Sequence, residues 1–98
     1  MKIKDLKEKV YKEISNIKRG EVLTYKELAL KVGSPKAIRA VANIVGKNPN
    51  PIVVPCHRVI RSDMKVGEYT YKGKRNQKMK LKLLKEEGVK IKGLIVMI

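Results

Sequence analysis

The sequence places its single cysteine directly before its single histidine, within the segment 55–59 (PCHRV). Thiolate is the nucleophilic form of cysteine, and an adjacent imidazole is a base that could take the thiol proton. Arg58 and Arg61 add positive charge nearby, which would favour the thiolate. A lone cysteine is also often a small buried apolar residue, so these residues alone leave open whether Cys56 is a nucleophile or a core residue. One Cys and one His are too few for a typical zinc site, and we expect no metal.

Two short helices joined by Gly-Ser-Pro are predicted upstream of the cysteine, over residues 24–46. Thr24 followed by Glu27 has the form of a capping box, and Gly33 would end that helix in a left-handed conformation. Ser34-Pro35 predicts a second helix, with serine as the N-cap and proline at the first helical position. The pair resembles a helix-turn-helix, whose second helix is the one that contacts DNA.

Apolar residues at intervals of three and four predict further helices at 3–17 and 74–87. The sequence NPNP at 48–51 ends the second helix of the pair, and the apolar run 52–54 would be a buried strand or an extended segment. Residues 61–73 are expected to form a loop or hairpin, and the tail 89–98 an edge strand or a surface that packs against a partner. The prediction is one small, mostly helical α+β domain over 1–98, with the helix-turn-helix packed beside the cysteine segment 48–60.

The composition favours a partner that is a polyanion. The 98 residues include 24 Lys and Arg against 9 Asp and Glu, a formal net charge of +15. Nucleic acid is the first candidate for such a basic chain, and an anionic membrane surface is the second. Between Leu28 and Ser62 there are six basic residues and no acidic one. No apolar run approaches the roughly 18 residues of a spanning helix, and a single cysteine excludes an internal disulfide. We therefore expect a reducing, cytoplasmic location, at the nucleoid in a prokaryote.

The order of these motifs resembles that of the O6-alkylguanine-DNA alkyltransferases, the methylated-DNA–protein-cysteine methyltransferases. PCHRV is similar to the family's active-site signature, and NPNPI at 48–52 is similar to the motif that precedes it. The residues TYKELA at 24–29 and PKAIRAV at 35–41 resemble its helix-turn-helix. GEY at 67–69 and LLKEEG at 83–88 resemble its remaining blocks. The resemblance covers residues 4–88.

This resemblance implies direct DNA repair in which each protein molecule reacts once. The alkylated guanine would be flipped out of a duplex bound through its minor groove, and the Cys56 thiolate would displace guanine from the alkyl carbon. No cofactor is implied, because the alkyl group is already activated. The implied partner is double-stranded DNA containing O6-alkylguanine, and we expect a monomer that does not bind membranes.

The resemblance also implies roles for individual residues in the reaction. Cys56 would accept the alkyl group, His57 would take the thiol proton through a water molecule, and Glu87 would orient and charge the imidazole. Tyr25 would donate a hydrogen bond to the flipped base and crowd the adjacent phosphate. Asn48 would hold the turn that leads into the cysteine segment.

Other residues are implied to bind the DNA or the base. Arg39 would fill the gap that the flipped base leaves in the stack, and further DNA contacts would come from Lys36, Ala37, Ala40 and Arg58. The carbonyl of Val59 would accept from the guanine amino group, and the segment Tyr69-Thr70 would close over the pocket. Without the family, Tyr25 could simply pack at a helix start and Arg39 could be a solvated cation.

The sequence departs from the family's pattern at two places. Ala42 stands where glycine is common, and the lid 70–73 (TYKG) replaces a serine followed by two glycines. We also expect no ribonuclease-H-like N-terminal domain of the kind that many relatives carry. One alternative is an alkyltransferase-like protein that binds lesions without reacting, but those relatives replace the cysteine, typically with tryptophan. A plain helix-turn-helix regulator is a second alternative, and it would leave the PCHRV segment without a purpose.

Overall fold

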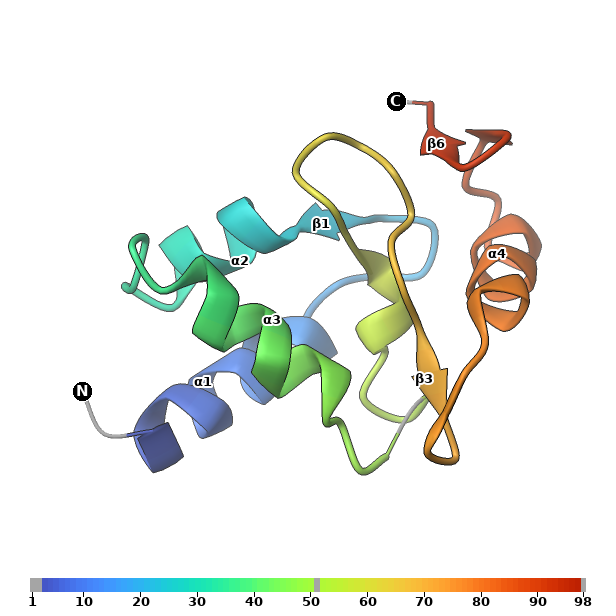
Figure 1. Cartoon of the computed structure of the whole chain (residues 1–98). Coiled ribbons are helices and arrows are strands. Elements are labelled where there is room, and N and C mark those ends of the chain that lie inside the picture. Colours follow the sequence, from blue (N-terminus) through green and yellow to red (C-terminus); the bar gives the residue numbers. More distant parts are fainter. Residues whose placement is uncertain (1–2, 51, 98) are drawn as a thin grey trace.

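The architecture is that of a mostly helical α+β protein, seen in a computed structural model that describes residues 3–50 and 52–97. Pro51 and Ile98, which fall in the predicted helix break and tail, lie outside the described residues. Helix α1 (Ile3–Ser15) packs against α2 (Tyr25–Lys31) and α3 (Ile38–Gly46), and α4 (Gln77–Glu86) lies across the cysteine segment from them (Figure 1).

The main core lies among these first helices and extends to the cysteine. Leu6, Val10, Ile14 and Ile17 are buried, as the apolar periodicity of the first helix predicts. One cluster joins these side chains to others from α2, α3 and the cysteine segment, namely Leu28, Ala29, Val32, Val41, Val45, Cys56, Val59 and Tyr69. Cys56 is therefore attached to the core that the predicted DNA-binding helices share.

The start and end of α2 confirm the sequence prediction. The Thr24 hydroxyl accepts from the amide of Glu27, and the Glu27 carboxylate accepts from the amide of Thr24, which completes a capping box. At the other end Gly33 has φ of +77°, the amide of Gly33 donates to Leu30, and the amide of Ser34 donates to Ala29. This pair of bonds is a Schellman motif, for which glycine is the favoured residue.

The predicted start of the next helix at Ser34-Pro35 is wrong. Because the amide of Ser34 still bonds back to Ala29, Ser34 belongs to the end of α2. The chain then makes a turn in which the amide of Ala37 donates to the carbonyl of Ser34 at 2.9 Å. Helix α3 begins only at Ile38, with Ala37 as its N-cap.

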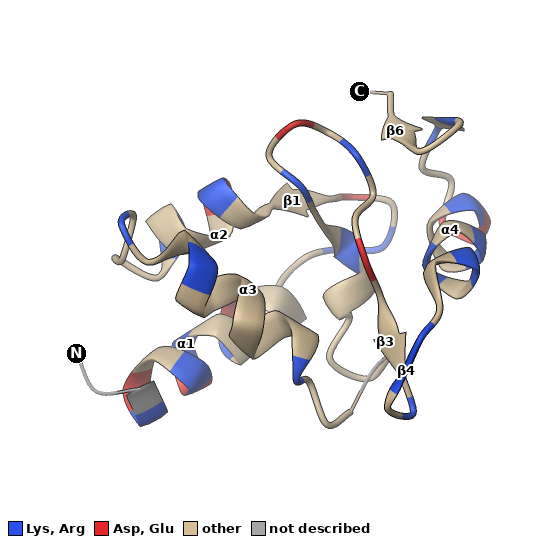
Figure 2. Ribbon diagram, in the orientation of Figure 1, with Lys and Arg blue, Asp and Glu red and all other residues tan. Residues whose placement is uncertain are grey.

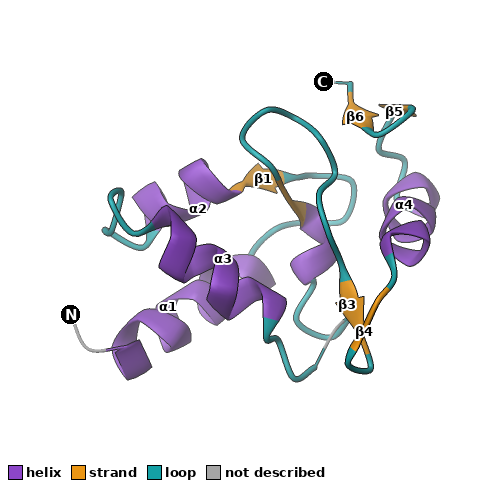
Figure 3. Cartoon of the chain, in the orientation of Figure 1, coloured by secondary structure: helices purple, strands orange, loops and turns teal. Residues whose placement is uncertain are grey.

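A short parallel pair of strands fixes the cysteine segment to the start of α2. Cys56–Arg58 form a single turn of 3-10 helix, η1, which leads into β2 (Val59–Ile60). Strand β2 pairs in parallel with β1 (Leu23–Thr24), with Leu23 opposite Val59 and Thr24 opposite Ile60. The residue that caps α2 and the residues that follow Cys56 are thus neighbours (Figure 3).

Two further pairs of strands precede and follow α4 in the sequence. β3 (Thr70–Tyr71) pairs antiparallel with β4 (Lys74–Arg75), so the helix predicted from residue 74 begins only at Gln77, with Asn76 as its N-cap. β5 (Ile91–Lys92) and β6 (Ile95–Val96) form a hairpin in the tail. Val96 is buried against the second apolar cluster, with Ile60, Val66, Leu84 and Val89. The tail therefore packs on its own chain through Val96.

The apolar run 52–54 is not the buried strand or snug extended segment that its composition predicts. Ile52 and Val53 lie in a turn and are 45% and 83% exposed, and Ile52 has φ of +79°. The amide of Val54 donates to the carbonyl of Asn50 at 2.9 Å and closes this turn. Only Val54 packs against the core. No helix within the described residues is both long and apolar enough to cross a membrane.

Candidate active site

Cys56 lies at the start of η1, on the wall of a pocket of about 290 Å³. The residue is 5% exposed, and its backbone amide donates to the carbonyl of Val54 at 2.7 Å. Four residues that the sequence places in the site line this pocket together, namely Tyr25, Cys56, Tyr69 and Thr70. Ala42, Asn43 and Glu68 line it too, so the position at which the resemblance leads us to expect glycine borders the pocket.

His57 is turned into the protein, where it meets the end of α4. Its Nε2 lies 3.1 Å from a carboxylate oxygen of Glu87, the C-cap residue of that helix. Burial raises the pKa of Glu87, but hydrogen bonds from Arg58 and His57 outweigh it and lower the pKa to about 2. The carboxylate is therefore ionised and accepts from Nε2–H, which leaves Nδ1 of the neutral ring as a base.

The free nitrogen of that ring is buried. Among the described residues, Nδ1 of His57 has no hydrogen-bond partner. Burial lowers the pKa of His57 and outweighs the opposing effect of Glu87, so the imidazole is neutral at pH 7. A buried neutral imidazole with an unpaired lone pair can accept a proton, and the Glu87 carboxylate stabilises the cation that results.

Arg58 completes the group around Glu87. Its Nε and Nη2 donate to the two carboxylate oxygens of Glu87 at 2.9 and 2.7 Å, and its Nη1 donates to the carbonyl of Ile17 at 2.7 Å. Such a two-point contact between guanidinium and carboxylate is strong and geometrically fixed. The sequence gives Arg58 a DNA contact, but the structure uses its guanidinium inside the protein.

The thiol of Cys56 is the resting form, contrary to the expectation that nearby arginines favour the thiolate. Burial raises the pKa of Cys56, and it is opposed by a side-chain hydrogen bond from Asn48, the charge of Lys80 and a backbone hydrogen bond. Arg58 forms an ion pair with Glu87, and Nη2 of Arg61 lies 2.9 Å from a carboxylate oxygen of Asp63. The two arginines are thus already neutralised by carboxylates.

Asn48 connects the end of α3 to the cysteine segment. Its side-chain amide donates to the carbonyl of Val54 at 2.8 Å, and its side-chain oxygen accepts from the amide of Asn50 at 3.0 Å. The same residue provides the hydrogen bond that lowers the pKa of Cys56. One side chain therefore both shapes the turn and lowers the pKa of the thiol.

Two tyrosines line the pocket together with Cys56. Burial, with a smaller effect of Cys56, raises the pKa of Tyr25 and raises that of Tyr69 to about 12. The Tyr69 hydroxyl is buried without a partner among the described residues, and its ring stands edge-on to His57 with centroids 6.5 Å apart. Both hydroxyls are neutral donors at pH 7.

The residues predicted to bind DNA from the helix-turn-helix lie on or near α3. Lys36 and Arg39 are exposed, while Ala37 and Ala40 are half-buried. Figure 2 shows basic positions on α2 and α3, and the sequence has no acidic residue from Leu28 to Ser62. The acidic residue of α2 is Glu27, whose carboxylate accepts from the Thr24 amide in the capping box, and α3 has no acidic residue.

Lys80 is a buried site residue that the sequence reasoning missed. It is 1% exposed, and its Nζ donates to the carbonyl of Val59 at 2.7 Å, the group predicted to accept from guanine. A carbonyl oxygen has two lone pairs, so this bond leaves one. Lys80 lies one helical turn before the buried Leu84, and this spacing was the available signal in the sequence.

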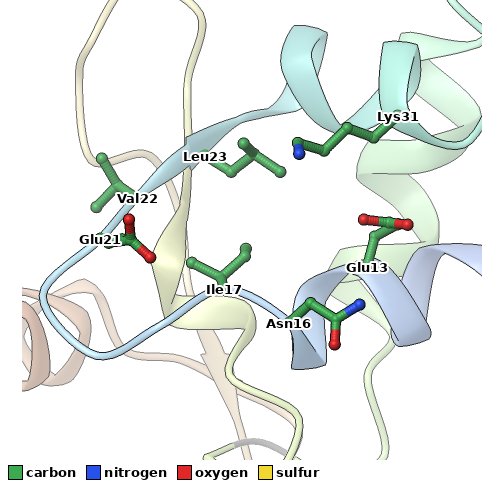
Figure 4. Close-up of a pocket in the computed structure, with 7 residues that line it drawn as sticks. All are labelled: Glu13, Asn16, Ile17, Glu21, Val22, Leu23 and Lys31. Carbon is green, nitrogen blue, oxygen red and sulfur yellow. The ribbon is translucent and has the colours of Figure 1, made fainter.

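A second hollow, of about 160 Å³, lies away from this chemistry. It is bordered by α1, β1 and α2, and its lining includes Glu13, Ile17, Glu21 and Lys31 (Figure 4). None of the predicted site residues lines it. Among the described residues, no three His, Cys, Asp or Glu side chains are grouped so that they could hold a metal ion.

Comparison with known proteins gives concordant matches. The family model described as "6-O-methylguanine DNA methyltransferase, DNA binding domain" matches residues 5–89. The methylated-DNA–protein-cysteine methyltransferases of Rattus norvegicus and Methanothermobacter thermautotrophicus are 45% and 44% identical over 80 residues, 82% of this chain. The chain spans 37% and 42% of their lengths.

Solved structures of similar fold include complexes with DNA. Atl1 of S. pombe, bound to damaged DNA containing O6-carboxymethylguanine, is 32% identical with a TM-score of 0.80, and the match covers 94% of this chain and 83% of Atl1. OGT of Mycobacterium tuberculosis in complex with DNA is 40% identical with a TM-score of 0.73, and the match covers 83% of this chain and 48% of OGT.

Proposed function

The chain belongs to the O6-methylguanine DNA methyltransferase family, and from this we propose that it repairs DNA by moving the alkyl group of O6-alkylguanine onto Cys56. The observation that carries the proposal is the position of Cys56, on a pocket wall shared with Tyr25 and Tyr69 and next to the pair His57–Glu87. Curated relatives named for this activity support it, at 44–45% identity over most of this chain.

The reaction is a displacement at the alkyl carbon. The sulfur of Cys56 forms a bond to that carbon while the bond from carbon to O6 of guanine breaks, and the electron pair of the broken bond stays on guanine. His57 takes the thiol proton at Nδ1 through a water molecule, and a proton returns to the departing guanine. Neutral guanine and S-alkylcysteine result, so each molecule reacts once.

Deprotonation must accompany binding of the substrate, because the buried thiol is protonated at rest. Burial raises the pKa of Cys56, and it lowers the pKa of His57 so that the imidazole is free to act as a base. Proton transfer between the two creates an imidazolium beside the ionised Glu87. The carboxylate thus stabilises the charge that the transfer produces.

The guanine must leave the duplex to reach a cysteine that is 5% exposed. Tyr25 lines the pocket, and its neutral hydroxyl is a donor suited to the polar edge of a base. Arg39, on the exposed part of α3, would occupy the position that the base leaves in the stack. The basic surface of α2 and α3 would bind the phosphates without regard to sequence (Figure 2).

The intact mass of the protein after incubation with a duplex that carries one O6-methylguanine tests this proposal. We expect a stoichiometric gain of one methylene, mapped to the peptide that contains Cys56, and no gain with an undamaged duplex of the same sequence. Lesion-dependent binding without a change in mass would refute alkyl transfer. No gain and no preference for the lesion would refute the repair function altogether.

We expect Arg39→Ala to slow repair of duplex DNA far more than reaction with the free base O6-methylguanine. Unstacking a base costs a few kcal/mol, so losing the side chain that fills the gap should slow the duplex reaction on the order of 10- to 100-fold. The measurement is the rate of methylation of Cys56 by each substrate. Lys82→Ala, which removes one charge from an exposed position of α4 that is not among the expected DNA contacts, is the control and should leave the ratio of the two rates unchanged. Equal losses on both substrates for Arg39→Ala would argue against a role in flipping.

The second candidate function is binding of alkylated guanine without transfer. It is favoured by the similarity in fold to Atl1. The structural match covers 94% of this chain and 83% of Atl1. The retained Cys56, on the wall of the pocket, favours transfer instead. The mass measurement distinguishes the two functions directly.

A further inference from the structure

Lys80 is a fully buried lysine that the proposed reaction does not yet use. It lies on the inner face of α4 with 1% exposure, while its neighbours Lys78 and Lys82 on the same helix are exposed. Its Nζ donates to the carbonyl of Val59 at 2.7 Å and to the carbonyl of Glu68 at 3.3 Å. Both hydrogen bonds go to neutral backbone groups, so neither neutralises the ammonium charge.

The two carbonyls belong to the two segments that build the wall of the Cys56 pocket. Val59 directly follows η1, which carries Cys56, and Glu68 lines the pocket beside Tyr69 and Thr70. Gly67, one residue earlier, is so close that a Cβ built there would lie 3.8 Å from Nζ. One ammonium group therefore joins the cysteine segment to the loop that faces it.

Burial of the Lys80 ammonium costs free energy, and a thiolate at Cys56 would offset this cost during the reaction. Burial lowers the pKa of Lys80 to about 8, and the opposing effects come from Cys56 and Glu68. Reciprocally, the charge of Lys80 lowers the pKa of Cys56. A buried cation without a bonded carboxylate favours a negative charge that develops close to it.

The other groups around the thiol do not supply positive charge at pH 7. Tyr11 of α1, Tyr25 of α2 and Tyr69 have raised pKa values and stay neutral, and the pKa of His57 is lowered. Asn48 contributes a neutral hydrogen bond. Arg58 is paired with Glu87, Arg61 with Asp63, and the carboxylate of Glu68 acts on Lys80 itself.

We propose that Lys80 is a positioning residue of the Cys56 site, which holds the Val59 carbonyl behind the cysteine segment to the Glu68 carbonyl of the facing loop and stabilises the thiolate by its charge. The part that concerns alkyl transfer rests on the proposed function. The part that concerns the thiolate does not, because it describes the protonation of Cys56 in the free protein. The two parts can therefore fail separately.

The test is the rate at which iodoacetamide alkylates Cys56 as a function of pH, followed by intact mass. Iodoacetamide needs no DNA, and the pocket of about 290 Å³ beside the sulfur admits so small a reagent. Lys80→Met removes the charge and the donors, while Lys80→Gln keeps a donor without charge. Lys82→Met, an exposed lysine on the same helix, is the matched control.

We expect both Lys80 variants to be alkylated more slowly at pH 7, on the order of tenfold, with the difference from the wild type shrinking above about pH 8, where Lys80 itself loses its charge. Lys82→Met should keep the wild-type profile, and Lys80→Arg, which retains the charge, should restore it at least in part. Thermal unfolding identifies the variants that are folded. If Lys80→Met is not folded, the alkylation rate of Lys80→Gln provides the test.

Two outcomes would overturn the proposal. Folded Lys80→Gln with the wild-type profile would show that the lysine only fills space, and an equal shift in Lys82→Met would show an effect of net charge alone. Methyl transfer from lesion-bearing DNA is measured in parallel on the wild-type protein. Absence of that transfer with a shifted iodoacetamide profile would refute the proposed function and leave the role of Lys80 in the thiolate intact.

Discussion

Cys56→Ala is expected to abolish methyl transfer from O6-methylguanine DNA while the protein still binds the lesion-bearing duplex. The sequence contains no other thiol, and the thiolate is the form of cysteine that attacks carbon. The substitution should leave the fold intact, because Cys56 is a small side chain whose backbone bond to Val54 does not involve sulfur. The basic residues of α2 and α3 are untouched, so affinity for DNA should stay close to that of the wild type.

Two measurements on the same sample check this prediction. Intact mass after incubation with the lesion-bearing duplex reports transfer, and a titration with labelled duplex reports binding. Cys56→Ser, which nearly preserves the shape of the side chain, serves as the matched variant. Like Cys56→Ala, it should bind the duplex without accepting the methyl group, because a hydroxyl is a far weaker nucleophile. Methylation of either variant would remove Cys56 as the acceptor. Loss of binding together with transfer would mean that the substitution had damaged the fold.

Glu87→Gln is expected to lower the free energy of unfolding at pH 7 by about 2 to 3 kcal/mol, since it removes the charge that Arg58 and His57 share. The pKa of Glu87 in the folded protein is about 2, below the ordinary value of 4.5. A lowered pKa means that the stabilisation is complete above pH 4.5 and is lost as pH falls toward 2. The difference between wild type and variant should therefore shrink in this window.

Urea unfolding at pH 7 and at pH values between 4.5 and 2 measures this difference. Glu86→Gln is the matched control, because Glu86 is exposed and Arg19 donates to its backbone carbonyl, which the substitution keeps. The control should unfold like the wild type at every pH. A difference for Glu87→Gln that stays constant on acidification would mean that the pKa of Glu87 is the same in the folded and unfolded protein, so that Arg58 and His57 do not stabilise its charge. We also expect slower methyl transfer by Glu87→Gln, because the imidazolium would lose its counter-charge.

Local pattern was enough to predict the helices and the capping of α2. Intervals of three and four placed Val10 and Ile14 in the core, and the Thr24–Glu27 spacing predicted a capping box that the structure contains. These features depend on residues within one or two turns of each other. The start of α3 was missed because Ser34 suits a helix N-cap equally well whether or not its amide is already bonded to Ala29.

Long-range contacts explain what the sequence could not predict around Cys56. Arg58 precedes Glu87 by 29 residues, and nothing near it in the chain indicates that its guanidinium turns inward rather than toward DNA. Lys80 looks like any other lysine of a basic helix until α4 is packed against Val59 and Glu68. Val53 is apolar but lies in a turn and is 83% exposed, because the Asn48 side chain donates to the Val54 carbonyl and the Val54 amide donates to the Asn50 carbonyl, which together fix the turn.

The hydrogen bonds of Arg58 also determine at what point of protein synthesis the Cys56 site can form. Its guanidinium joins Ile17, 41 residues before it, to Glu87, 29 residues after it. A nascent chain that has reached η1 holds Cys56 but has neither the partner of His57 nor the cation of α4. The cysteine of an unfinished chain is therefore an ordinary thiol, and the environment that tunes it forms only once residues 80–87 have been made and packed.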